Sequence, residues 1–153
     1  MKRIIYILSA ILFLGVSFES CTEIDVLMDP DMPANRDITY TLGKVIEYDD
    51  INVKGIDIAP YFDFFEKLRF NLHFENHEIV SMEFNQDELP LTPFKYAMPS
   101  GVQKCYLDKE VLPWQLKLES GETVAYYMRG EFYIPFQLDC NTISYEYRFK
   151  AVE

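Results

Sequence analysis

Apolar and polar residues alternate with a period of two through most of the chain from Ile38 onward, and this pattern constrains the fold more than any other feature. The clearest run is LRFNLHFE at residues 68–75, in which every second residue is Leu or Phe. Successive side chains of a β-strand point to opposite faces, so such a run buries one face and leaves the other in water. The apolar phase resumes with Val80, Met82 and Phe84, and similar runs recur at 103–107, 111–118, 123–128, 131–138 and 142–152.

About seven to nine short strands separated by turns predict an all-β domain, most simply an antiparallel sandwich of immunoglobulin-like or similar type. A small closed barrel of lipocalin-like type is the alternative, because periodicity alone does not separate the two. Gly43 predicts a bulge or bend in the first strand. Ala59 to Lys67 is the one helical candidate, with Pro60 suited to a first helical turn. Asn85 to Gly101 holds three prolines and predicts a long loop of the functional or mobile kind.

The length and charge of the chain exclude several classes of function. A chain of 153 residues suits one domain. Its 25 acidic and 14 basic residues give a net charge of −11, which argues against a phosphate-binding surface and therefore against nucleic-acid partners. Apolar residues make up 49% and aromatic residues 16% of the chain, enough for a packed core.

The N-terminus has the pattern of an export signal. Lys2 and Arg3 form a basic start, and residues 4–16 that follow are uncharged and rich in Ile, Leu and Phe. A membrane-spanning helix needs about 20 apolar residues, so this stretch is too short for an ordinary anchor. We therefore predict a signal peptide over residues 1–20.

Residues 18–21, Phe-Glu-Ser-Cys, resemble the lipobox of bacterial lipoproteins, in the looser form found in Bacteroidota. The resemblance implies lipidation of Cys21 and a membrane partner through that anchor. Glu23 and Asp25 partly resemble the surface-export signals of the same lipoproteins. The expected location is the outer membrane of the cell envelope, on the periplasmic side or at the surface. Ordinary cleavage after Ser17, giving a secreted soluble periplasmic protein, is the alternative.

The domain boundaries follow from proline and charge. Pro30 and Pro33 lie among acidic residues, which disfavours helix and strand alike. We predict an acidic tether over residues 21–37 and a single β domain over residues 38–153.

The cysteines allow two structural alternatives, and neither the cysteines nor the histidines have the spacing of a metal site. With Cys21 lipidated, Cys105 and Cys140 remain, and they form either a disulfide or two separate buried thiols. There is no CxxC motif or Cys/His cluster, and His73 and His77 flank a predicted hairpin turn, so we expect no metal and no cofactor.

The sequence carries no catalytic motif, and aromatic residues are its strongest functional signal. It contains neither a nucleophile elbow nor a glycine-rich phosphate loop. A possible ligand platform, on which sugar rings could stack, comprises Trp114, Tyr126, Tyr127 and Tyr133. Ordinary cross-strand pairing of these rings is the alternative.

Three functions are consistent with these features. The first is a non-catalytic binding or accessory module on a lipid anchor, with a glycan as the ligand. The chain resembles in this respect the small lipoproteins of unknown function that Bacteroidota often encode beside glycan-uptake machinery. The second is a structural or assembly protein of the envelope that holds a protein partner by a sheet edge or by the Asn85–Gly101 loop. The third and weakest is a hydrolase that uses a pair of carboxylates.

Overall fold

The computed structural model describes residues 32–49, 54–137 and 142–152. The predicted signal peptide, Cys21, Cys140 and most of the predicted tether lie outside these residues. The strands of the described part are β1 (Asn35–Tyr48), β2 (Ile56–Asp57), β3 (Arg69–Glu75), β4 (Glu78–Asn85), β5 (Gln103–Asp108), β6 (Trp114–Leu118), β7 (Thr123–Met128), β8 (Glu131–Gln137) and β9 (Ser144–Ala151). Its helical segments are the 3₁₀ helices η2 (Ala59–Tyr61) and η3 (Asp63–Lys67) and the short α-helix α2 (Pro93–Ala97).

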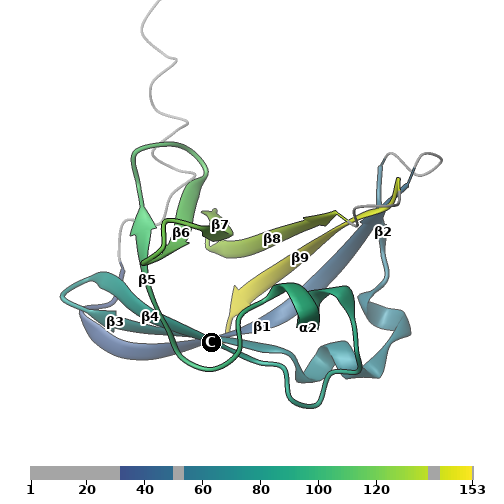
Figure 1. Ribbon diagram of the computed structural model, residues 1–153, viewed down its shortest axis with the longest axis horizontal. Helices are drawn as coiled ribbons and strands as arrows, with labels where there is room; N and C mark the ends of the chain where they lie inside the picture. The colour runs from purple at the N-terminus through teal and green to yellow at the C-terminus, as the bar shows by residue number, and fades with distance from the viewer. Residues whose placement is uncertain (1–31, 50–53, 138–141, 153) are drawn as a thin grey trace, which may run out of the picture.

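The strands close into an antiparallel barrel (Figure 1). Each strand from β3 to β9 pairs with the next, and β1 pairs with both β3 and β9, so eight strands form the ring within the described residues. The short β2 pairs with the end of β1. The all-β prediction is confirmed, and the architecture is the predicted alternative, a small closed barrel, rather than the sandwich that the sequence first suggested.

The length of β1 explains the closure. Its first half, from Asn35 to Thr41, pairs with β3, and its second half pairs with β9 as far as Tyr48. The register shifts between Leu42 and Lys44, which confirms the bulge predicted at Gly43. Alternation shows which face of a strand is buried but does not show its neighbours, so this double pairing could not be read from the sequence.

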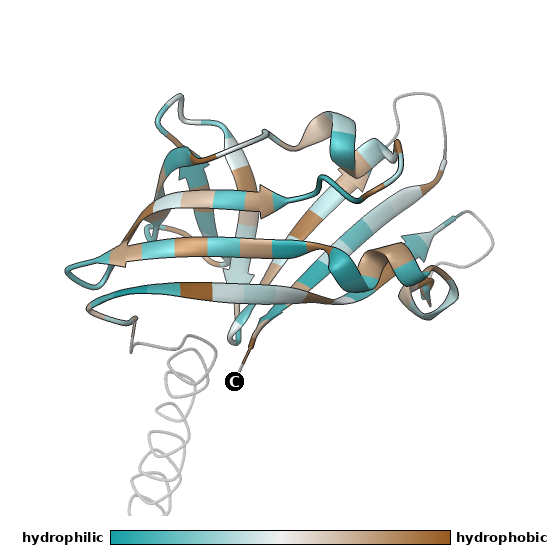
Figure 2. Ribbon diagram, turned by 90° about the horizontal axis from the view of Figure 1, so that it is seen from below, coloured by the Kyte–Doolittle hydropathy of each residue, from teal (hydrophilic) through white to brown (hydrophobic). Residues whose placement is uncertain are grey.

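Aromatic rings fill the barrel. Alternation along β3 and β4 is visible in Figure 2, and it brings Phe70, Phe74 and Phe84 to the inner face. Phe70 is fully buried and stacks on Phe84 at 4.5 Å between ring centroids. Phe132 and Phe149 lie edge-to-face with the same ring, at 5.4 and 5.6 Å between ring centroids. An eight-stranded barrel is just wide enough for such side chains to fill its interior.

A plug built from the predicted loop closes one end of the barrel. Within residues 85–101, Thr92 caps α2 by accepting a hydrogen bond from the Lys95 amide, and Pro93 occupies the first turn. The helix inserts Phe94, which is fully buried and lies 4.7 Å from Tyr147 and 5.4 Å from Phe84, measured between ring centroids. The prediction of a wholly irregular loop was therefore wrong over these five helical residues.

The predicted helix at residues 59–67 forms two 3₁₀ segments instead. Pro60 lies in the first turn of η2, as expected, and Phe62 between the two segments is extended. Phe65 from η3 packs against Tyr147 and adds to the plug. We call this the helical end of the barrel; in the described residues no helix has the length and apolar character needed to cross a membrane.

The strand region begins earlier than predicted. Asn35 to Asp37 belong to β1 rather than to the tether, because they pair with β3 and Asp37 bonds His73. Met32 is also buried, and its carbonyl lies 2.7 Å from the His77 Nδ1 atom. The His77 amide donates to the Ala34 carbonyl. We call residues 32–35 the strap, since they tie the chain to the β3–β4 turn.

The strap lies at the end of the barrel opposite the plug. This end carries the β3–β4 turn at residues 76–77, the β5–β6 loop at residues 109–113 and the β7–β8 turn at residues 129–130. Successive turns of an antiparallel meander alternate between the two ends, which places these three together. Figure 1 shows the β3–β4 and β5–β6 connections at the left and the helical end at the right. We call it the hairpin end.

Candidate ligand-binding face

The predicted aromatic platform is divided between two faces of the barrel wall. Trp114 pairs with Tyr127, and Tyr126 pairs with Tyr133. Directly opposed residues share a face, while neighbours along a strand do not. The four residues therefore form two pairs, one inside and one outside, and the single platform expected from the sequence does not exist.

The inner pair belongs to the core. Trp114 and Tyr127 stack with centroids 5.9 Å apart and ring planes 19° apart. Tyr127 is only 3% exposed and also packs on Phe132. The Lys109 ammonium lies over the Trp114 ring, 5.0 Å from its centroid, and adds a cation–π contact to the pair.

The outer pair is available to a ligand. Tyr126 and Tyr133 stack with centroids 5.8 Å apart and planes 20° apart, and both are half-buried. Tyr133 also lines a cavity of about 410 Å³ on the outer face of β7, β8 and β9. That volume lies within the range of small-molecule sites, roughly 300–1,000 Å³.

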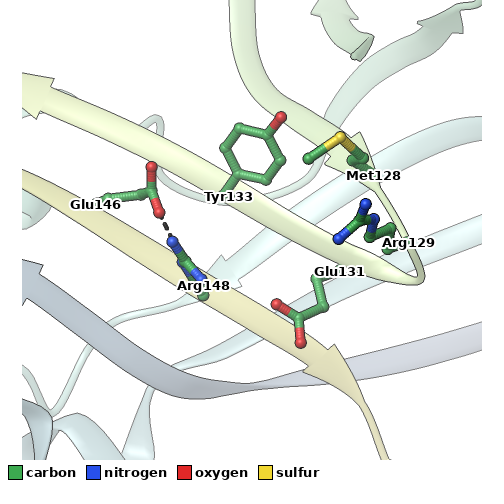
Figure 3. Close-up of a pocket in the computed structure, with 6 residues that line it drawn as sticks. All are labelled: Met128, Arg129, Glu131, Tyr133, Glu146 and Arg148. Atoms are coloured by element: carbon green, nitrogen blue, oxygen red, sulfur yellow. Dashed lines mark hydrogen bonds and ion pairs between the residues drawn. The ribbon is translucent and has the colours of Figure 1, made fainter. Parts of the chain in front are cut away.

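Charged groups of both signs surround Tyr133 in this cavity (Figure 3). Its other lining residues are Met128, Arg129, Glu131, Glu146 and Arg148. In Figure 3 the Tyr133 ring lies between the Glu146–Arg148 pair of β9 and the β7–β8 turn. We call these six residues, together with Tyr126, the outer-face site.

Two ion pairs hold the acidic groups of the site. The Arg148 Nε atom donates to Glu146 Oε1 at 2.6 Å, and the Lys150 ammonium lies 3.0 Å from Glu131 Oε1. The side chains of Glu146 and Arg148 are 24% and 38% exposed, so their pair is partly shielded from water. Each carboxylate of the site is therefore held beside a cation of β9.

The phenol of Tyr133 is held in its neutral form. Partial burial, reinforced by the nearby charge of Glu146, raises the pKa of Tyr133 above its ordinary value. The hydroxyl therefore remains a hydrogen-bond donor throughout the physiological pH range. The site thus combines an aromatic surface, a neutral donor, two guanidinium groups and two carboxylates.

The charged residues of the site were missed in the sequence, although a signal for them was present. Residues 142–152 alternate apolar residues with Ser144, Glu146, Arg148 and Lys150, which places those four on the outer face of one strand. What the sequence lacked was the register that sets β9 beside β8 and brings Arg148 opposite Tyr133.

A second hollow on the outer wall lacks an aromatic surface. It measures about 460 Å³ on β1, β3 and β4, and its described lining contains neither tyrosine nor tryptophan. His73 lies there on the exposed side of β3, as predicted, with its Nδ1 atom 2.6 Å from Asp37 and its Nε2 atom 3.3 Å from Glu75. Among the described residues, no three His, Cys, Asp or Glu side chains are placed to hold a metal ion.

The cysteine alternatives stay open. The Cys105 side chain is 6% exposed on the inner face of β5, and burial raises the pKa of its thiol to about 12. Cys140 lies outside the described residues, so a Cys105–Cys140 disulfide remains a prediction.

Comparison with known proteins adds no assignment to this geometry. No protein-family model, no curated protein and no solved structure matches the chain.

Proposed function

We propose that this protein is a non-catalytic, lipid-anchored module of the cell envelope that binds a glycan at its outer-face site. The observation that carries the proposal is the stacked pair Tyr126–Tyr133 at the edge of a cavity lined by Arg129, Arg148, Glu131 and Glu146.

The chemistry of the site suits a sugar. The apolar face of a pyranose ring can lie on the face of a tyrosine, as another aromatic ring would. Vicinal hydroxyl groups are both donors and acceptors, and they match the fixed pairs of donors on arginine and acceptors on glutamate. Most glycans carry little charge, so the net charge of −11 does not repel them.

The same geometry disfavours hydrolysis. A glycosidase needs one carboxyl group that stays protonated to act as the general acid. The two carboxylates of the site, Glu131 and Glu146, are instead each engaged in an ion pair with a cation at 3.0 Å or less. The hydrolase alternative is therefore the weaker one.

The lipid anchor is the second part of the proposal, and it rests on the lipobox-like residues that end at Cys21. Growth of expressing cells with a radiolabelled fatty acid should label the protein, and Cys21→Ser should abolish the label. An unlabelled protein, or a mature chain that starts at Phe18, would support the secreted periplasmic alternative.

The glycan part is tested by calorimetric titration of the protein with host and plant polysaccharides. Tyr133→Ala should weaken binding about tenfold or more, since it removes both the stacking surface and a donor. Tyr106→Ala is the matched control, because Tyr106 is 46% exposed on a different part of the outer wall. Absence of binding to every glycan tested, or equal losses in both variants, would refute the proposal.

A second candidate, a structural or assembly protein, is favoured by one observation. Leu91 and Tyr96 are 77% and 76% exposed on the segment around α2. Large apolar side chains with that exposure are the residues that a protein partner would cover. Pull-down from solubilised membranes should then recover a stoichiometric partner, and the double variant L91S/Y96S should lose it.

A further inference from the structure

The β5–β6 loop exposes apolar side chains at the hairpin end of the barrel. Val111 and Leu112 are 51% and 50% exposed near the middle of residues 109–113. Single exposed apolar residues are common on protein surfaces. Val111 and Leu112 differ from such single residues because they are adjacent in one loop and because the strap lies beside that loop.

The strap leaves the barrel next to this loop. Met32 and Lys109, the first residue of the loop, line the same cavity of about 280 Å³, together with His77. The hydrogen bonds from His77 to the carbonyls of Met32 and Ala34 fix the position of the strap. The point at which the N-terminal segment joins the barrel is therefore beside the loop.

The length of that segment limits how far this end can lie from an anchored Cys21. Ten residues lie between Cys21 and Met32, and the eleven fully extended steps from one Cα atom to the other span at most about 40 Å. A barrel held by Cys21 is thus attached to the membrane through its hairpin end, which carries the β5–β6 loop, and not through the helical end with its plug.

We propose that the β5–β6 loop is a membrane-contact site, in which Val111 and Leu112 enter the interfacial region of the phospholipid layer that holds the lipid anchor. This inference rests on the proposed lipid anchor. Lys109 reaches over the Trp114 ring at 5.0 Å and can turn its ammonium to a lipid phosphate.

Attachment through the tether allows a membrane contact of only two side chains to persist. Two apolar side chains alone bind a bilayer weakly. Attachment through Cys21 turns the contact into an intramolecular event with a high effective concentration. The exposed Leu91 and Tyr96 do not share this advantage, because they lie at the helical end. The outer-face site begins at the β7–β8 turn, at this same end, and extends along the outer wall to Glu146.

The single tryptophan of the chain provides the test, because Trp114 directly follows the loop. The full chain is produced in Gram-negative cells, purified in detergent and reconstituted into zwitterionic phosphatidylethanolamine–phosphatidylcholine vesicles with bromine on the acyl chains. Zwitterionic lipid avoids repulsion by the acidic protein. Floated protein should lose Trp114 emission relative to the same protein in unbrominated vesicles, and V111S/L112S should recover most of that emission.

Controls separate this inference from the anchor. L91S/Y96S, at the helical end, should be quenched like the unchanged protein. Flotation with the vesicles and the intact mass of the protein show whether Cys21 is acylated. Quenching of Trp114 emission is therefore measured only on protein that is anchored. If acylation fails, Cys21 is coupled chemically to a maleimide lipid in a Cys140→Ser background, with Cys105 protected by burial. Anchored protein whose emission is unaffected by bromine, or is quenched equally in V111S/L112S, would overturn the membrane-contact site.

Discussion

The two stacked aromatic pairs of the β6–β8 wall have nearly the same ring geometry and opposite surroundings. Trp114–Tyr127 and Tyr126–Tyr133 differ by only 0.1 Å in centroid distance and 1° in plane angle. The inner pair is covered by Phe132 and Lys109, whereas the outer pair borders a cavity with charged walls. Ring stacking alone therefore does not define a binding site. The surroundings decide whether a stack stabilises the fold or receives a ligand.

The largest difference between the pairs should appear in stability. Tyr127→Ala should lower the free energy of unfolding by about 3–5 kcal/mol, because it leaves a cavity in the core. Tyr126→Ala, on the outer wall, should lower it by about 1 kcal/mol or less. Urea denaturation measures the two losses in the free energy of unfolding, which are compared directly when the variants have the same m-value. Equal losses would show that the outer pair is structural too.

Alkaline titration should separate inner from outer tyrosines next. Burial raises the pKa of Tyr147, on the inner face, from its ordinary value of 10 to about 12. Its contribution to stability is fully present below pH 10 and is lost as pH rises to 12, because only the unfolded state ionises in that interval. The loss should reach about 3 kcal/mol. Tyr147→Phe should flatten the dependence seen in denaturation series between pH 9 and 12, and an unchanged slope would contradict this.

Removing one hydroxyl should produce a smaller effect. Tyr133→Phe keeps the stacking surface and loses the donor, so glycan affinity should fall about three- to tenfold, the value of one hydrogen bond. Tyr127→Phe, on the inner face, should leave affinity unchanged. Calorimetric titration compares the two, and an effect of Tyr127→Phe as large as that of Tyr133→Phe would place the ligand elsewhere.

The smallest predicted effect concerns the outer hollow on β1, β3 and β4. The hydrogen bond that the His73 imidazole donates to Asp37 raises the pKa of His73 above its ordinary value near 6.5, with partial burial opposing and Glu75 adding to the increase. The pair therefore contributes below pH 6.5 and its contribution is lost as pH rises through the higher value. Asp37→Asn should lower the His73 pKa in an NMR titration, with little change in stability because both groups are exposed. A His73 pKa that does not fall would show that Asp37 is not the main cause.

Local alternation predicted the individual strands well. The hairpin at residues 68–85 forms with its turn at Asn76 and His77, and both residues take the left-handed conformation that a tight turn needs. Closure was beyond the reach of the same pattern, since it depends on β1 bending at Gly43 to pair on both sides. The alternation of apolar and polar residues does not indicate which strands pair with β1.

The sequence predicted the tyrosines of the candidate site but not its charged residues, because these come together only through the register of the paired strands. Adjacent Tyr126 and Tyr127 must face opposite ways, which the sequence shows. Whether Trp114 and Tyr133 join one or the other depends on strand pairing, which it does not show. Arg148 completes the site from β9, twenty-two residues beyond Tyr126 in the chain. A site assembled across strands in this way becomes visible only when the neighbours are known.

The seam between β4 and β5 gives the barrel a preferred place to break. In the described residues these strands share two paired positions, Ser81 with Lys104 and Met82 with Gln103, whereas β3 and β4 share seven. The ring of a closed barrel offers no unpaired strand edge to another chain. Local opening of such a ring begins where two neighbouring strands share the fewest hydrogen-bonded positions. Amide exchange should therefore be fastest along this seam, and transient opening there would expose the phenylalanine-rich interior to whatever apolar molecule is nearby.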